Sequence, residues 1–253
     1  MAESTLSETR TGLRREIAHY LGYSRDTTTW TTDESTELDY IITQGLRSYY
    51  NHPTVPQWPG HEWSFLKPTA SLVVTEDIWQ YQLPDDYAGI IGDLTFGSSQ
   101  ASPSVRVISE LQIRQMRQLG TSSGIPQYAA IVPLASTGIM GQRFQLQLYP
   151  TPSGTYTLTY KYTSAPYALT ATLLYPLGGV NHIEGILASC LAVAERIKND
   201  EQGVQWAHFM RTLEANIARD SAQGPETLGY NGDPKRGRIY PVIRSGGYNG
   251  ATY

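Results

Sequence analysis

Cysteine is nearly absent from this sequence. Among 253 residues there is one, Cys190. A single cysteine excludes an intramolecular disulfide framework and any zinc site that needs several cysteines, and it fits a reducing compartment. Cys190 falls on the apolar stripe of a predicted helix, so we expect a small core residue rather than a reactive thiolate.

Long apolar runs are also missing. A membrane-spanning helix needs about 20 consecutive, mostly apolar residues, and no window of the sequence approaches this. The first ten residues, MAESTLSETR, contain no apolar run, so we expect no secretory signal there. The sequence therefore predicts a protein that does not contact membranes.

The chain has no excess of positive charge. It carries 19 Lys and Arg against 23 Asp and Glu, for a net charge of −4. A protein that reads a nucleic-acid sequence usually presents a strongly basic surface. The charge balance argues against that class.

Motifs with the context needed for catalysis are lacking as well. Residues 120–124 match G-x-S-x-G around Ser122, but a predicted helix precedes them, whereas a hydrolase serine sits on a strand-to-helix elbow. Two carboxylate pairs, at residues 76–77 and 85–86, lie at predicted turns, where Asp is locally favoured. None of the five histidines forms the H-E-x-x-H zinc pattern. We expect no catalytic residue, no metal site and no cofactor.

Two rival functions stay open at this point. A cell-wall glycan hydrolase would use Glu76, Asp77, Asp85 or Asp86 as acid and base, with two carboxylates about 5–9 Å apart across a cleft. A sugar-binding β-sandwich would instead use exposed Trp58, Trp63 or Trp79. Zymography on bacterial cell wall and glycan-array binding test these alternatives.

Tyrosine, by contrast, is abundant, with 18 residues. Tyrosine suits half-buried strands and protein interfaces. In residues 143–162, apolar and polar side chains alternate on both sides of the turn residues 150–154, which predicts a β-hairpin with one buried face. Other short alternating runs from Ser71 onward predict six or seven strands in an antiparallel, sandwich-like domain.

Helical periodicity occurs mainly near the two ends of the chain. One helix is predicted from Leu6 to Leu21, with Thr5 and Glu8 as its capping box, and a second begins after Asp33 as N-cap. A third begins near Asn181 with Glu184 as a capping box, breaks at residues 199–200, and is followed by a fourth. Each pair has an apolar face, so we predict a four-helix bundle into which the β domain is inserted.

The predicted fold is therefore α+β, with these limits: an N-terminal helical half at residues 1–66, the inserted β domain at 67–178, a C-terminal helical half at 179–223, and an extended tail at 224–253. The tail has no periodicity and cannot bury a face of its own. Its aromatic and basic residues are of the types found at interface anchors. The candidate binding residues are Tyr230, Lys235, Arg236, Arg238, Tyr240, Arg244, Tyr248 and Tyr253.

Several soft motifs follow one another between the helical ends. They are Glu62-Trp63-Ser64-Phe65-Leu66; an aromatic-x-Leu-Pro-x-Asp-aromatic pattern within residues 79–87; Gly124-Ile125-Pro126-Gln127-Tyr128; and Leu-x-Leu-x-Pro-x-Pro at residues 146–152, followed by Tyr160-Lys161-Tyr162. In this order they resemble the head-to-tail adaptor proteins of tailed bacteriophages, which include the tail tubular protein A group.

This resemblance implies a structural virion protein of the neck or tail, assembled in the cytoplasm of the bacterial host. It implies a ring of twelve copies beneath the portal protein, through which double-stranded DNA passes without sequence-specific binding. It also implies contacts with a downstream tail or nozzle protein and with tail fibres. The tail residues would then bind the portal or a neighbouring copy, and the acidic balance suits a channel along which DNA slides.

Overall fold

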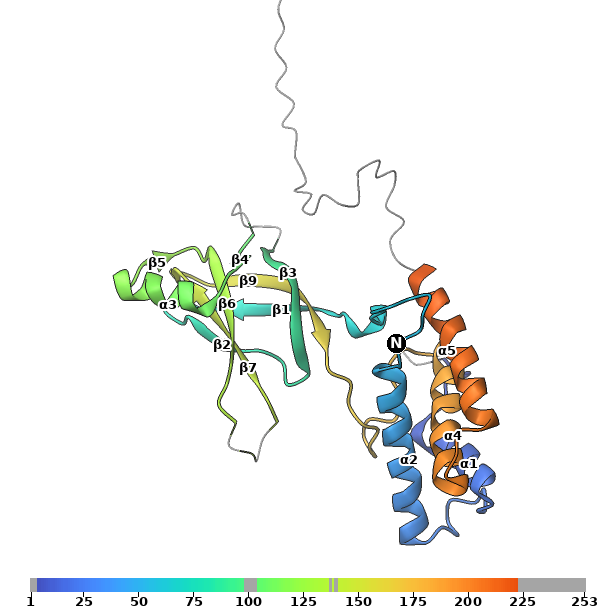
Figure 1. The fold of residues 1–253 in the computed structure, drawn as a ribbon. Coiled ribbons are helices and arrows are strands. Elements are labelled where there is room, and N and C mark those ends of the chain that lie inside the picture. Colours follow the sequence, from blue (N-terminus) through green and yellow to red (C-terminus); the bar gives the residue numbers. More distant parts are fainter. Residues whose placement is uncertain (1–3, 98–103, 137, 139–140, 223–253) are drawn as a thin grey trace, which may run out of the picture. The chain divides into compact units, whose positions relative to one another are not determined.

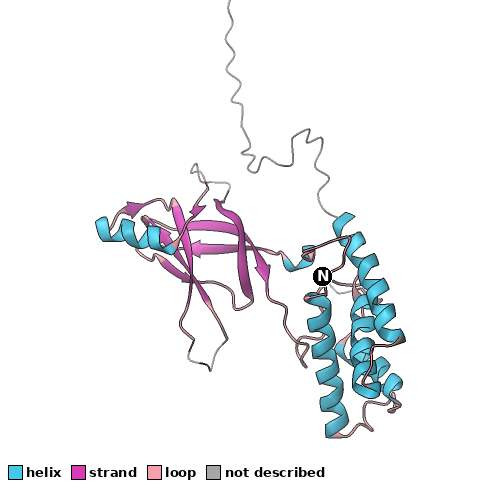
Figure 2. Ribbon diagram, viewed as in Figure 1, coloured by secondary structure: helices cyan, strands magenta, loops and turns pink. Residues whose placement is uncertain are grey.

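The structure, a computed structural model, describes residues 4–97, 104–136, 138 and 141–222. These residues belong to the first of the chain's two units, Met1–Gln223. Along the chain, helices occupy both ends of this unit and all the described strands lie between them, as Figure 1 and Figure 2 show. The predicted α+β class is confirmed.

Four helices enclose one hydrophobic core, and two of them come from each end of the described chain. They are α1 (Arg10–Leu21), α2 (Thr32–Tyr50), α4 (Ile183–Asn199) and α5 (Val204–Ala222). Leu13, Ile41, Ile186 and Phe209, one from each helix, are completely buried in this core. The finer layout of a four-helix bundle and the four domain limits stay predictions.

The first helix begins later than its apolar pattern predicted. Thr9, not Thr5, is the N-cap, and its side chain accepts a hydrogen bond from the Gly12 amide. Leu6 lies before the helix and is 77% exposed. The C-terminal end is as predicted, because Gly22 adopts the left-handed conformation (φ 90°) that glycine accommodates most easily.

Two other predicted caps are wrong. Thr31, rather than Asp33, caps α2, because its hydroxyl accepts from the Glu34 amide while the Glu34 carboxylate accepts from the Thr31 amide at 2.7 Å. At α4 the N-cap position is His182 rather than Asn181, and its ring makes no capping bond. The end of α4 at residues 199–200 is confirmed.

The middle of the described chain is mainly β-structure. It follows a short 3-10 turn, η1 (Ser64–Leu66), and includes a helix, α3 (Glu110–Leu119). Ser109 and Gln112 form the capping box of this helix, and Gly120 is its C-cap. The strands are β1 (Thr69–Val74), β2 (Gln80–Gln82), β3 (Tyr87–Phe96), β4 (Arg106–Val107), β5 (Ser123–Gly124), β6 (Tyr128–Pro133), β7 (Phe144–Tyr149), β8 (Thr151–Pro152) and β9 (Tyr156–Ser164).

Two main sheets share a second hydrophobic core. Their strand orders are β1-β9-β3 and β2-β7-β6-β4, and a bridge between Leu94 and Val105 connects β3 to the chain just before β4. Leu146 and Leu148 of one sheet and Leu158 of the other are completely buried in this core. Most pairs are antiparallel, as predicted, but β4 pairs with β6 and β5 with β8 in parallel.

The predicted hairpin at residues 143–162 does not form. Its two limbs are the strands β7 and β9, which lie in different sheets: β7 pairs with β2 and β6, and β9 with β1 and β3. The turn residues instead carry the chain from one sheet to the other, and β8 within them pairs with β5. The alternation of apolar and polar residues correctly predicted two strands with one buried face each. It could not predict which strands lie next to them, because alternation does not depend on the neighbouring strand.

Candidate functional site

The predicted binding residues of the tail, from Tyr230 to Tyr253, lie outside the described residues. Among the described residues, a buried polar cluster surrounds the last turn of α5. Asp220 is 4% exposed and accepts hydrogen bonds from the amide of Ser64, at 3.0 Å, and from its hydroxyl. These bonds fasten the end of α5 to the loop that follows α2.

His61 completes this cluster. Its Nε2 lies 3.1 Å from Asp220 Oδ2 but does not form a hydrogen bond with this carboxylate. Burial lowers the pKa of His61, and the neighbouring Asp220 opposes that shift. The arrangement is not a Ser-His-Asp triad, because the Ser64 hydroxyl donates to the aspartate and not to a histidine base.

An open hollow of about 640 Å³ adjoins the cluster. Its wall includes the end of α2, the loop after it and residues 163–168. Aromatic rings and basic groups contribute much of the lining, among them Arg47, Tyr50, His52, Trp63, Lys67 and Tyr167. This lining resembles a protein-binding surface more than a catalytic site, because aromatic and arginine side chains are the types enriched at interfaces.

Behind this wall, buried polar groups connect three helices and the loop. The Asn216 amide donates to the Tyr49 hydroxyl at 2.9 Å. That hydroxyl donates its own proton to Nδ1 of His182, also at 2.9 Å, because this nitrogen is the one acceptor it contacts among the described residues. Trp63 stacks on the Tyr49 ring with centroids 4.9 Å apart and donates from its indole to the Tyr49 carbonyl. Burial lowers the pKa of His182, which keeps the ring neutral.

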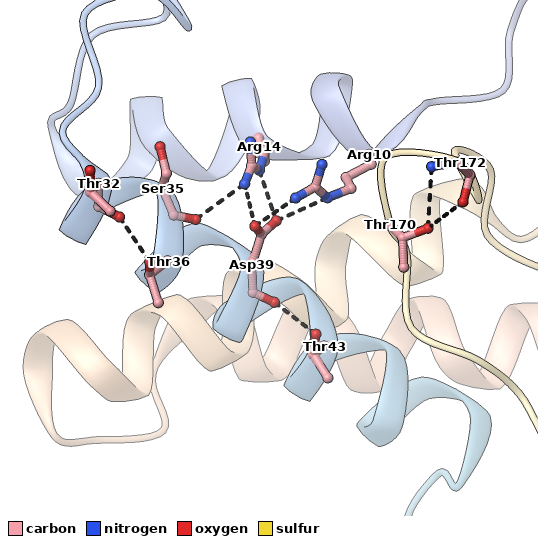
Figure 3. Close-up of polar contacts among 9 residues, drawn as sticks. All are labelled: Arg10, Arg14, Thr32, Ser35, Thr36, Asp39, Thr43, Thr170 and Thr172. Carbon is pink, nitrogen blue, oxygen red and sulfur yellow. Dashed lines mark hydrogen bonds and ion pairs between the residues drawn. The ribbon is translucent and has the colours of Figure 1, made fainter.

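A second polar cluster joins α1 to α2. Arg10 and Arg14 each donate two hydrogen bonds, from Nε and Nη2, to the carboxylate of Asp39. The distance from Nε to Asp39 Oδ1 is 3.0 Å for Arg10 and 2.8 Å for Arg14. Figure 3 shows the two guanidinium groups converging on this carboxylate from one helix. Sequence reasoning missed the cluster, although Arg10 and Arg14 at i, i+4 spacing share one helix face.

Comparison with known proteins supplies the family. Residues 9–232 match the family model of the SU10 adaptor protein, which covers both helical ends and the β part. The chain belongs to the SU10 adaptor protein family. No curated protein matches it. Membership confirms the resemblance to bacteriophage head-to-tail adaptors but not the narrower one to the tail tubular protein A group.

An SU10 adaptor is a structural protein of the virion neck, not an enzyme. It works as an oligomer with other neck components. None of the helices in the described ranges combines the length and the apolar character that a membrane span requires. In the same ranges, no three His, Cys, Asp or Glu side chains come together as a metal site would require.

One of the candidate catalytic carboxylates, Asp86, stabilises the fold. Asp86 accepts hydrogen bonds from the hydroxyls of Tyr162, at 3.2 Å, and Ser164, at 2.7 Å. Asp85 contacts only the nearby Gln82 amide in the described chain. Ser122 is exposed and follows helix α3, and its carbonyl accepts from the Thr151 amide, so the elbow of a nucleophilic serine is not built.

The tryptophans proposed for sugar stacking are not a set of exposed rings. Trp63 is 1% exposed, so its predicted exposure is wrong. The Trp79 ring is covered by the guanidinium of Arg117, whose carbon lies 3.7 Å from the ring centroid. Cys190 is the buried core residue that its helix pattern predicted, and burial raises the pKa of its thiol to about 12.

Proposed function

We propose that this adaptor forms a ring of twelve copies that joins the portal to the tail and surrounds the path of the exiting DNA. The observation that carries the proposal is the family match over residues 9–232, which includes every described helix and strand. The net charge of −4 supports a channel along which DNA slides rather than binds. The ring assembles in the host cytoplasm and also contacts the downstream tail or nozzle protein and tail fibres.

The helical part is proposed to be a regular four-helix bundle that serves as the rigid body of each subunit. Its support is the single core shared by α1, α2, α4 and α5, because one core resists separation of the two ends of the chain. The inserted β part presents exposed apolar side chains, including Val73, Leu111, Leu119 and Ile125. Such side chains suit contacts with another protein.

The tail is proposed to dock on the portal or on a neighbouring copy through Tyr230, Lys235, Arg236, Arg238, Tyr240, Arg244, Tyr248 and Tyr253. Ordering an extended segment costs on the order of 1–2 kcal/mol per residue in backbone entropy, so a large contact must offset it. Repetition around a ring adds avidity, which lets each single contact be weak.

Electron microscopy of the purified protein, alone and mixed with its portal, tests the proposal. We expect rings that cap the portal, whereas a chain that ends at Gln223 should fold and fail to join it. Limited proteolysis should remove the tail from the free protein and not from the assembled neck. Globular monomers in the images, or normal joining by the truncated chain, would contradict the proposed ring and the proposed role of the tail, respectively.

A further inference from the structure

Strand β1 has one edge that pairs with nothing in the described chain. The amide of Tyr162 donates to the Pro68 carbonyl at 3.1 Å, which fixes the alternation of the antiparallel ladder between β1 and β9. Ala70, Leu72 and Val74 therefore direct their N–H and C=O groups toward β9. Those of Thr69, Ser71 and Val73 point the other way.

This outward edge is exposed. The side chains of Thr69, Ser71 and Val73 are all exposed, Val73 to 57%. Their outward backbone groups accept and donate no hydrogen bond within the described ranges. The edge stops at Thr75, because the Tyr81 hydroxyl accepts from the Thr75 amide at 2.7 Å and donates to its carbonyl at 3.1 Å. Three donors and three acceptors remain in a row.

The other edge strands of the main sheets are too short or too irregular to pair with a further strand, whereas β1 is neither. Strand β2 has three residues and β4 has two, which is too short to template a strand. Strand β3 is interrupted by register shifts and by Gly92 at φ 75°. The six residues of β1, TASLVV, pair with β9 in unbroken register and contain no charge and no proline.

The described chain offers no second free edge of comparable length, so two copies cannot extend these sheets head to tail through described strands alone. Residues 223–253 lie beyond the described chain and span up to about 100 Å when fully extended. Within them, only residues 238–243 (Arg-Ile-Tyr-Pro-Val-Ile) are rich in the β-branched and aromatic side chains that strands favour.

We propose that residues 238–243 of a neighbouring copy add a strand to the free edge of β1. This inference rests on the proposed ring, in which each copy meets two neighbours through different surfaces. Pro241 has no N–H and must face away from β1, which places the N–H groups of Tyr240 and Val242 toward it. Glu76 and Asp77, just beyond the C-terminal end of β1, supply opposite charge for Arg238 when the added strand runs antiparallel to β1.

Adjacent proline substitutions in the full-length protein test the pairing. Val242→Pro removes an N–H that faces β1. Ile243→Pro is the matched control: it also replaces a β-branched residue by proline, but it removes an N–H that faces away from β1. We expect Val242→Pro to weaken self-association at least tenfold by analytical ultracentrifugation. The amides of Thr69, Ser71 and Val73 should lose hydrogen-exchange protection in Val242→Pro and keep it in Ile243→Pro. Equal behaviour of the two variants would overturn the proposal.

Disulfide trapping decides whose segment occupies the edge. In an antiparallel pair, residues whose backbone groups face each other are directly opposite, and their side chains lie on the same face of the sheet. Copies with Ser71→Cys mixed with copies with Val242→Cys should form a linked dimer, and Ile243→Cys, whose side chain lies on the opposite face, should not. Cys190 is buried and does not compete. Linkage only within a doubly substituted chain, or no linkage, would overturn the proposal. If the protein still forms rings when no linkage between copies is found, the strand-addition proposal fails but the proposed function does not.

Discussion

His182 accepts a hydrogen bond that a protonated ring could not accept. Its Nδ1 receives the Tyr49 hydroxyl, and that hydroxyl is itself held by Asn216. Burial is the main cause that lowers the pKa of His182 below 6.5; Asp220 opposes the shift, and Arg219 and His61 add to it. A histidine with a lowered folded pKa stabilises the fold above its unfolded pKa and loses that contribution as the pH falls.

The protein should therefore become less stable as the pH drops below about 6.5, the ordinary pKa of histidine. In His182→Asn, the side-chain oxygen can still accept from Tyr49 but cannot be protonated in this range. We expect the melting temperature of the wild type to fall more between pH 7.5 and pH 5.5 than that of the variant. Because His61 shifts in the same direction, some acid sensitivity should remain. Parallel pH profiles would rule out this role of His182.

Asp86 and Asp85 differ in what they hold, although they are neighbours in sequence. Asp86→Asn replaces one acceptor of the Tyr162 and Ser164 hydroxyls by an amide donor, which should cost about 1–3 kcal/mol of unfolding free energy. Asp85→Asn is the matched control and should be nearly neutral. Denaturant titration measures both.

Neither substitution, nor Ser122→Ala, should reduce infectivity when the variant protein folds normally. A particle that assembles normally but is not infectious would support a catalytic role for the substituted residue.

At the scale of elements, helix α5 takes its N-terminal cap from another helix. Gly203, just before α5, has no side chain that could act as a cap. Instead Glu195 of α4, which is 5% exposed, accepts from the amides of Gly203, Gln205 and Trp206 at 3.0–3.1 Å through Oε2. A carboxylate at a helix N-terminus also meets the positive end of the helix dipole.

Glu195→Ala should leave these amides without an acceptor and cost about 1–3 kcal/mol, whereas Glu195→Gln keeps a carbonyl oxygen and should cost less. The loss should be visible in thermal unfolding and as faster hydrogen exchange in the first turn of α5. If alanine and glutamine destabilise equally, the capping interpretation fails and the loss reflects packing alone.

Sequence patterns predicted element types better than partners. Alternation identified the buried faces of β7 and β9 correctly, but it could not say that the chain changes sheets between them, because strand pairing depends on distant residues. The same limit applies to Asp39 and Asp220. Each is an ordinary acidic residue in the sequence, and its partners, Arg10 and Arg14 in one case and Ser64 in the other, come from separate elements.

At the scale of the whole molecule, the helical part depends on contacts between the two ends of the chain. The helical faces were readable from periodicity, and so was the expectation that the ends meet. Within α4, Leu187 is half-buried, whereas the neighbouring Ile186 is completely buried among the four helices. Periodicity locates a face to within one residue, and only packing shows its centre.

Ile186→Asp should accordingly destabilise all four helices together. A buried, unpaired carboxylate costs several kcal/mol, which is a large share of the roughly 5–15 kcal/mol stability of a domain. Ile197→Asp is the matched control, since Ile197 lies on the same helix and is 40% exposed. Hydrogen exchange should accelerate in α1 and α2 as well as in α4 and α5 of Ile186→Asp and stay near wild type in Ile197→Asp. Loss confined to α4 and α5 would show that the two helical ends are stable independently, and the shared core would then not act as one cooperative unit.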